Sequence, residues 1–289
     1  MSTFELRKPR DFGQIITDTF TYIRVHFRTL GKALFLFVFP IVIISGALVS
    51  SSFISMFNFA DLNSTQSMDP AATANMGSWF IQFLIGMILF MINFLLIYVI
   101  VFKHMQLIDD GVEDIEIGML LEDFGRNVFG VLGILIITGI ASFIGALFFI
   151  IPGIYIAYKL SLAPVIFIVE EEPLGDALSK SWDATRDFWW FTFGMSFVMG
   201  IIMNFASYIF IVPMYILIGI VSFSTGSNDA SGISTIISVL YGLSVVVPAL
   251  LYCMPITSQA LVYFNIQERK TGRSMMDKIE SLGEQNTTA

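Results

Sequence analysis

The chain has 289 residues, of which 56% are hydrophobic and 13% are charged, and its formal net charge is −8. Soluble domains carry about 25% charged residues, so this composition, with a mean hydropathy of +0.79, excludes an ordinary soluble domain and predicts an integral membrane protein. A single cysteine, Cys253, excludes a disulfide framework and a cysteine metal cluster. The sequence has no basic patch, which excludes nucleic acid as a partner, and no motif that calls for a cofactor or a metal.

Long runs with almost no charged residue indicate membrane-spanning helices, because a helix needs about 20 apolar residues to cross the hydrocarbon core. Of the 15 Lys and Arg residues, only Lys159 lies within such a run. The others fall in both termini and in alternate connections, which the positive-inside rule assigns to the cytoplasm. The sequence therefore predicts an all-α polytopic protein of a bacterial-type cytoplasmic (inner) membrane, with both termini in the cytoplasm. The six expected spans cover residues 33–57, 79–102, 128–149, 152–169, 190–222 and 234–264.

Three stretches beside these spans predict surface helices. Residues 12–30 carry apolar side chains at helical spacing, and such a helix beside a span is expected to lie in the interface plane. The acidic stretch 109–127 is expected to hold a second, short helix. A third begins at Pro173, because acids and a proline near the first turn are typical helix-start signals. Its expected apolar stripe is Leu174, Leu178, Trp182, Thr185 and Trp189.

The apolar run 128–169 is too long for one span, at about 1.5 Å of rise per residue. Pro152 and Gly153 interrupt it, and proline ends or kinks a helix while glycine tolerates a turn. These two residues are therefore the expected structural break of a tight hairpin. In a five-crossing alternative, 152–169 is re-entrant and the C-terminus lies outside, but the basic residues of the tail argue against it.

An internal repeat is visible, because residues 13–24 align without gaps with residues 175–186. Glycine, aliphatic, Ser/Thr, aromatic and arginine positions coincide. This pattern favours duplication of a unit made of one surface helix and one membrane hairpin, although amphipathic helices also resemble one another by composition. A single membrane domain is expected over 1–266, followed by a polar cytoplasmic tail over 267–289. The repeat units would cover 12–102, 112–169 and 173–266.

Three stretches carry a resemblance to a known family. They are FGQIITDTFTYIRVHFRTL, IPGIYIAYKLSLAPVIFIVEEEPLGDALSKSWDATRDFWW and ALVYFNIQERKTG. The middle one is the most specific, with a Pro-Gly break, a basic residue, an Ala-Pro, an acidic end and an Ala-Leu-x-x-Ser-Trp-x-x-Thr helix. In these features the chain resembles the membrane domain of the glycerophosphoryl diester phosphodiesterase type and its uncharacterised stand-alone bacterial membrane-protein relatives. The resemblance implies an architecture rather than an activity, because the fused enzymes carry their catalytic residues on a separate soluble barrel, for which this chain has no room.

The candidate binding residues are few. Lys159 is the one base inside an expected span, where a charge costs about 2.5–3.5 kcal/mol on insertion scales. It would bind an anionic headgroup or substrate, with Tyr155 one turn away as a hydrogen-bond acceptor. The structural alternative is a lysine that reaches the interface or binds a carbonyl freed by Pro164. Arg24 and Arg186 hold equivalent places in the repeat and would bind lipid phosphates, unless they are ordinary surface charges.

Catalysis is not expected. The adjacent acids 170–172 are explained by helix capping, whereas acid–base chemistry needs carboxylates that converge on one site. Phosphate-loop, His-Glu-x-x-His and Gly-x-Ser-x-Gly sequences are missing. The expected function is that of a non-catalytic accessory or scaffold protein that interacts with membrane lipids, a membrane-protein partner or a second copy of itself. The alternative is a small transporter or lipid-translocating protein that uses Lys159, which prolines inside the expected spans favour.

Overall fold

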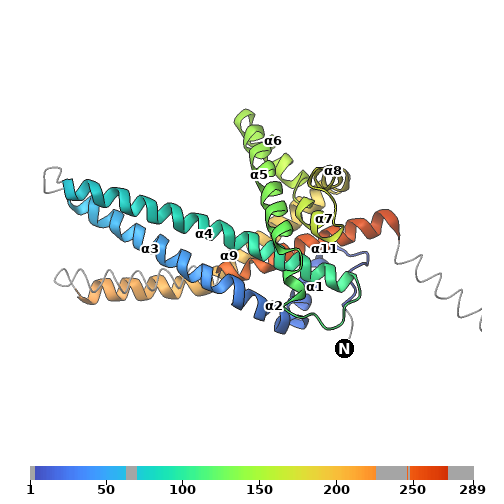
Figure 1. Ribbon diagram of the computed structural model, residues 1–289, viewed down its shortest axis with the longest axis horizontal. Coiled ribbons are helices and arrows are strands. Elements are labelled where there is room, and N and C mark those ends of the chain that lie inside the picture. Colours follow the sequence, from blue (N-terminus) through green and yellow to red (C-terminus); the bar gives the residue numbers. More distant parts are fainter. Residues whose placement is uncertain (1–3, 63–69, 226–245, 247, 273–289) are drawn as a thin grey trace, which may run out of the picture. The chain divides into compact units, whose positions relative to one another are not determined.

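The computed structural model describes residues 4–62, 70–225, 246 and 248–272. All regular secondary structure within these residues is helical. Six helical stretches are long and apolar enough to cross a membrane. The protein is therefore an all-α polytopic membrane protein, as the sequence predicts (Figure 1). The six stretches are Phe27–Ser52, Gly77–Asp109, Phe124–Phe148, Ile150–Val169, Trp189–Leu217 and Pro248–Thr271.

The helices range from a single turn to 40 residues. In chain order they are α1 (Phe12–Val25), α2 (Phe27–Ala33), the π-helical η1 (Leu34–Val38), α3 (Phe39–Leu62), α4 (Pro70–Asp109), the 3-10 turn η2 (Met119–Leu121), α5 (Phe124–Phe148), α6 (Ile150–Lys159), α7 (Ala163–Val169), α8 (Leu174–Ala184), α9 (Trp189–Thr225) and α11 (Cys253–Thr271). The connection expected at 58–78 is shorter than predicted, because α3 runs on to Leu62 and α4 begins at Pro70, where proline suits a first helical turn. Residues 63–69, and the connection between the fifth and sixth expected spans from residue 226 on, lie outside the described residues.

The chain divides into two compact units. Unit 1 comprises Met1–Gly31, Tyr98–Ile201 and Cys253–Ala289, and unit 2 comprises Lys32–Ile97 and Ile202–Tyr252. Unit 1 thus holds α1, α5 to α8, α11 and the adjoining ends of α4 and α9. The expected repeat units cut across this division, so the duplication and the single membrane domain both stay predictions.

In unit 2, α3 packs against α4 at a glycine. Gly86 of α4 approaches α3 so closely that an added Cβ would lie 2.8 Å from Cγ2 of Val49 and 3.2 Å from Cβ of Leu48. At the same contact, the Ser51 hydroxyl donates to Oε1 of Gln82 at 3.3 Å. Small residues at such contacts let two membrane helices approach closely and gain van der Waals attraction.

In unit 1, α1 begins with a capping box, in which Asp11 and Gln14 each accept a backbone hydrogen bond from the other. The single helix expected over 12–30 is wrong, because the chain leaves the helical conformation at His26 and α2 begins at Phe27. The buried face of α1 is Ile15, Thr19 and Tyr22, and it packs against α11. One face of α1 is therefore covered by protein rather than by lipid headgroups.

The hairpin of α5 and α6 is present, with the two helices side by side (Figure 1). Its break lies at Phe149, which is extended, and not at the predicted Pro152 and Gly153. Pro152 lies in the first turn of α6, where the missing N–H has no helical partner to lose. Gly153 is required by packing, because an added Cβ there would lie 2.7 Å from Cβ of Ala146 and 2.8 Å from the carbonyl oxygen of Ser142.

The span expected at 152–169 is two helices rather than one. The chain turns at Leu160 to Leu162, and α7 begins with Pro164 in its first turn. Every residue of α7 up to Ile168 is buried, whereas most of α6 is exposed or half-exposed. The two halves of the expected span therefore lie in different surroundings.

Two of the expected surface features are also corrected. Within the acidic stretch 109–127, residues 110–123 form a loop with one 3-10 turn instead of a separate α-helix, and Asp123 has a φ of 53°. In α8 the buried residues are Ala177, Ser181 and Ala184, whereas Trp182 of the expected stripe is exposed and Trp189 is the first residue of α9. Small side chains replace the expected large ones because α8 packs directly onto the chain at Lys159, whose carbonyl accepts from the Ser181 hydroxyl at 2.9 Å.

The last described helix reaches further than predicted. The sixth span was expected to end at 264, but α11 continues to Thr271, and both Asn265 and Glu268 are buried. The reason is packing within unit 1, because α11 contacts α1, α7 and α8. The beginning of the expected span, over 234–245, lies outside the described residues.

Candidate functional site

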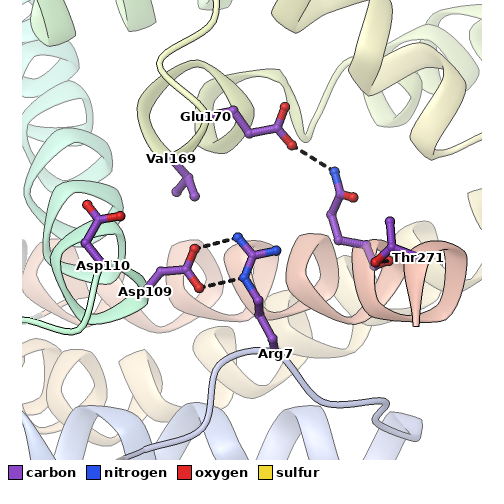
Figure 2. Close-up of a pocket in the computed structure, with 7 residues that line it drawn as sticks. Arg7, Asp109, Asp110, Val169, Glu170 and Thr271 are labelled. Carbon is purple, nitrogen blue, oxygen red and sulfur yellow. Dashed lines mark hydrogen bonds and ion pairs between the residues drawn. The ribbon is translucent and has the colours of Figure 1, made fainter. Parts of the chain in front are cut away.

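A polar pocket lies in unit 1 where four segments of the chain meet. The N-terminal segment, the end of α4, the end of α7 and the end of α11 surround a cavity of about 520 Å³ (Figure 2). A volume of this size lies within the range of small-molecule sites, about 300–1,000 Å³. The lining residues are Arg7, Asp109, Asp110, Val169, Glu170, Gln267 and Thr271.

One wall of the pocket is a paired charge. The Arg7 guanidinium donates from Nε to Oδ1 of Asp109 at 2.7 Å and from Nη2 to Oδ2 at 2.5 Å. This two-bond geometry is the strong form of an arginine–carboxylate pair. The hydrogen bonds to Asp109 raise the pKa of Arg7, although partial burial opposes them. Asp109 ends α4, so the pair attaches the N-terminal segment to that helix.

The opposite wall is built around Glu170, just after α7. Its carboxylate accepts hydrogen bonds from the Tyr263 hydroxyl, from Nε2 of Gln267 at 2.9 Å and from Nζ of Lys180 at 2.6 Å. Lys180 also donates to Glu172 at 2.7 Å, and its bonds to Glu170 and Glu172 raise the pKa of Lys180. Glu170 therefore joins α7, α8 and α11, a role that the helix-capping explanation of 170–172 did not foresee.

Asp110 is the least engaged carboxylate of the pocket. It lies exposed just beyond α4, and partial burial, together with the negative charges of Asp109 and Glu171, raises its pKa. The lining thus carries three carboxylates, those of Asp109, Asp110 and Glu170, against the one guanidinium of Arg7. This excess of negative charge favours a cation in the cavity.

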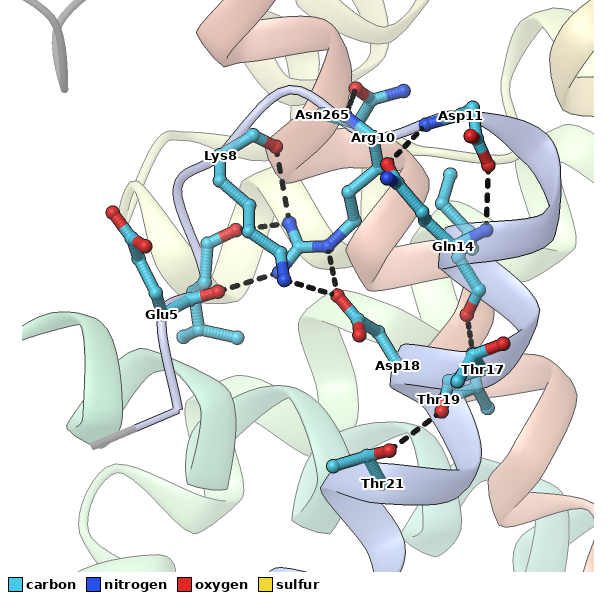
Figure 3. A network of polar contacts seen from close by, with 12 residues as sticks. Glu5, Lys8, Arg10, Asp11, Gln14, Thr17, Asp18, Thr19, Thr21 and Asn265 are labelled. Atoms are coloured by element: carbon cyan, nitrogen blue, oxygen red, sulfur yellow. Dashed lines mark hydrogen bonds and ion pairs between the residues drawn. The ribbon is translucent and has the colours of Figure 1, made fainter. Parts of the chain in front are cut away.

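A second polar network fixes the N-terminal segment beside the pocket (Figure 3). Arg10 is 1% exposed, and its guanidinium donates to Asp18 at 2.8 Å and to the carbonyls of Glu5 at 2.5 Å and Leu6 at 2.6 Å. Burial lowers the pKa of Arg10, although Asp18 opposes this effect. Lys8 binds the same Asp18 carboxylate at 2.8 Å.

The predicted candidate Lys159 lies outside the pocket and is 2% exposed. Its Nζ donates to the Trp182 carbonyl at 3.1 Å and lies 5.2 Å from the centre of the Trp182 ring. Tyr155 contributes its ring face, 5.8 Å away, rather than its hydroxyl. The carbonyl belongs to the last turn of α8, where a helix carries partial negative charge, and not to the residues that Pro164 frees.

The two predicted arginines do not meet the pocket either. Arg24 lies in the last turn of α1, and Arg186 follows the end of α8; both are exposed. Their side chains are therefore accessible from outside the protein, which contacts with lipid headgroups require.

Both histidines of the chain meet in unit 1, which the sequence analysis did not anticipate. The Tyr22 hydroxyl and Nδ1 of His104 are 2.5 Å apart, and the rings of His26 and His104 are 5.1 Å apart. Burial lowers the pKa of His26. The described part of the chain brings together no three His, Cys, Asp or Glu residues that could hold a metal ion.

No family model matches the chain, and no curated protein or solved structure matches it. The resemblance to the membrane domain of the glycerophosphoryl diester phosphodiesterase type therefore stays a prediction.

Proposed function

We propose that this protein is a non-catalytic scaffold of the bacterial-type cytoplasmic membrane, and that unit 1 binds a basic segment of a partner protein on the cytoplasmic side. The charge of the pocket carries the proposal. Asp109, Asp110 and Glu170 line it against Arg7, and Lys180 offsets part of the charge of Glu170 from outside the lining. A lysine or arginine side chain suits such a cavity, whereas an anionic headgroup would meet repulsion.

The cytoplasmic placement rests on the basic residues around the pocket. Arg7, Lys8 and Arg10 lie in the N-terminal segment, and Arg269 and Lys270 lie at the end of α11. The Arg269 guanidinium donates to the Arg10 carbonyl at 2.6 Å, so the two groups belong to one face of unit 1. Clusters of Lys and Arg close to the ends of spans favour the cytoplasmic side.

The absence of catalysis is proposed from the way the carboxylates are held. Asp109 is paired with Arg7, and Glu170 accepts from Tyr263, Gln267 and Lys180. A general acid or base needs a carboxylate that can exchange its proton with a substrate. Groups engaged in this way suit recognition of a charged segment better than proton transfer.

Lipid contacts are the second part of the proposal. The exposed side chains of Arg24 and Arg186 would meet anionic headgroups beside α1 and α8. The transport alternative receives less support, because it needs Lys159 to face a substrate. Nζ of Lys159 instead donates to the carbonyl of Trp182, within a shell of aromatic rings.

The experiment compares two neighbouring aspartates. The purified protein is placed in phosphatidylcholine nanodiscs, and binding of a fluorescent hexalysine peptide is measured. Asp110→Asn, which changes the pocket lining, should weaken binding several-fold. Asp114→Asn removes the same charge from the same loop but lies outside the lining, and should leave binding nearly unchanged.

Two outcomes would count against the proposal. If both variants weaken binding equally, the peptide is attracted only by the general charge of the loop. If the unaltered protein does not bind the peptide at low salt, a basic partner segment is excluded.

A further inference from the structure

The turn between α5 and α6 is unusual in its composition. No charged residue occurs between Arg126 and Lys159. At the turn, five successive apolar side chains are 69–79% exposed, namely Leu147, Phe148, Phe149, Ile150 and Ile151. A turn that emerged into water on the far side of a membrane would leave all five in contact with water, at about 25 cal/mol per Å² of apolar surface. The turn therefore suits hydrocarbon rather than water.

The opposite end of α6 lies at the level of charged, exposed residues. The carbonyl of Lys159 accepts from Ser181 at 2.9 Å and from Thr185 at 3.2 Å, so the end of α8 lies against it. Asp183, in the same turn of α8, is exposed, and its carbonyl accepts from Nζ of Lys270 at 2.9 Å. Exposed charges of this kind are excluded from hydrocarbon, so Lys159 marks the membrane surface.

Aromatic residues support the same boundary. The indole of Trp189 donates to the Tyr155 carbonyl at 3.2 Å, and Trp190 beside it is exposed. Tryptophan and tyrosine gather at the level of the headgroups. The lipid-facing part of α6 thus begins close to Tyr155 and Lys159 and ends at the turn.

The second arm of the hairpin offers no additional lipid-facing length. After Lys159 the chain turns and continues as α7, whose residues Ala163 to Ile168 are all buried. This helix is covered by protein, since it contacts α5, α8 and α11. On this arm, therefore, only the ten residues of α6 offer side chains to lipid.

We propose that the α5–α6 hairpin enters one leaflet only and turns back near the middle of the bilayer. Ten helical residues are about 15 Å long, while the hydrocarbon core is about 30 Å thick. Any tilt makes the reach shorter, so α6 cannot carry the chain across. The hairpin contacts the acyl chains of the leaflet on the side of Lys159, and its Gly153 contact holds the two arms together as one wedge.

This arrangement changes the topology without changing the sides of the termini. The candidate span Phe124–Phe148 is the first arm of the hairpin, α5, and Ile150–Val169 divides into the second arm, α6, and the buried helix α7. The other four candidate spans carry the chain across, so both described ends remain on one side. The five-crossing layout, with its C-terminus outside, does not arise.

Depth measurements by electron paramagnetic resonance test whether the α5–α6 hairpin turns back inside the bilayer. In a Cys253→Ala background, a single nitroxide is attached at Phe149→Cys or at Ile140→Cys, both at exposed positions, in liposomes of the full-length protein. Accessibility to oxygen and to a water-soluble nickel complex gives the depth of each label. The turn position 149 should be the deeper of the two, and 140, which lies further from the turn, the shallower.

Each alternative gives another pattern. In a hairpin that crosses the bilayer, 140 would be deepest and 149 would approach the far surface. In a hairpin that lies on the surface, both labels would be shallow. Either result overturns the proposal. Ile151→Cys, also exposed, is the replacement if the label at 149 disturbs the protein.

Discussion

Arg10 in the N-terminal segment and Asn265 on α11 are joined by a hydrogen bond of 2.8 Å, from the backbone amide of Arg10 to Oδ1 of Asn265. The Arg269 side chain donates to the same Asn265 oxygen at 3.1 Å and to the Arg10 carbonyl at 2.6 Å. The backbone amide and the backbone carbonyl of Arg10 are therefore both bonded to side chains of α11, which holds the N-terminal segment on this helix. Arg7 lies only three residues before Arg10, so the position of its guanidinium in the pocket depends on this attachment.

Replacing Arg10 should destabilise the protein strongly. Arg10→Ala leaves Asp18 without its buried partner and frees the carbonyls of Glu5 and Leu6, a change that typically costs about 3–5 kcal/mol. Lys8→Ala is the matched control, because Lys8 binds the same Asp18 oxygen from a half-exposed position, and pairs at the surface contribute about 0–1 kcal/mol. Thermal unfolding midpoints in detergent would separate the two. Equal midpoints for both variants would contradict the role given to Arg10.

Asp18 should make stability depend on acid pH. Partial burial acts to raise the pKa of Asp18, but the hydrogen bonds from Lys8 and Arg10 outweigh it and the pKa is lowered. A carboxylate with a lowered folded-state pKa stabilises the folded state above its unfolded pKa, about 3.9. That contribution is lost as the pH falls through the folded-state value. As the pH is lowered from about 5 to about 2, unfolding midpoints should fall less steeply for Asp18→Asn, and an unchanged slope would refute the assignment.

The spans were predictable because hydrophobicity is a local property of the chain. The position of the charge-free hairpin follows from the distribution of apolar residues alone, and the six candidate spans agree with the six expected ones within several residues at most boundaries. The break at Phe149 was harder to predict, because Pro152 and Gly153 carry strong turn signals. Proline suits a first helical turn as well as a helix break, and glycine suits a close contact between helices as well as a turn.

The pocket could not be predicted from local patterns. Glu170 meets Gln267 across 97 residues, and Arg7 meets Asp109 across 102 residues. Each of these residues, taken alone, resembles an ordinary charged or polar side chain near a membrane surface. Lys159 illustrates the opposite case. Its position inside an apolar run marked it as unusual, but its partner, the Trp182 carbonyl, is a backbone group without any signature in the sequence.

Gly153 provides a test of the hairpin packing. In Gly153→Ala the new methyl group would lie 2.7 Å from Cβ of Ala146 and 2.9 Å from the backbone nitrogen of that residue, so one helix must shift. Overpacking of this kind typically costs about 1–3 kcal/mol. Gly139→Ala on α5 is the control, because nothing lies within 4 Å of the added carbon. Its unfolding midpoint should be unchanged or higher, and a Gly153→Ala midpoint equal to it would show that the helices do not approach this closely.

Lys159→Met should separate a structural lysine from a functional one. The variant keeps most of the side-chain volume but removes the charged donor of the Trp182 carbonyl, which keeps the hydrogen bond from the Thr185 hydroxyl at 3.2 Å, and hydrogen bonds to charged groups contribute about 1.5–3 kcal/mol. The unfolding midpoint should fall, while hexalysine binding to the remaining folded protein should be unchanged because Lys159 does not line the pocket. Lys180→Met is the contrasting control. Lys180 is exposed, so stability should change by less than about 1 kcal/mol, and peptide binding should tighten because Glu170 loses a cationic partner. A Lys159→Met protein of normal stability that no longer binds the peptide would instead place Lys159 in the functional site.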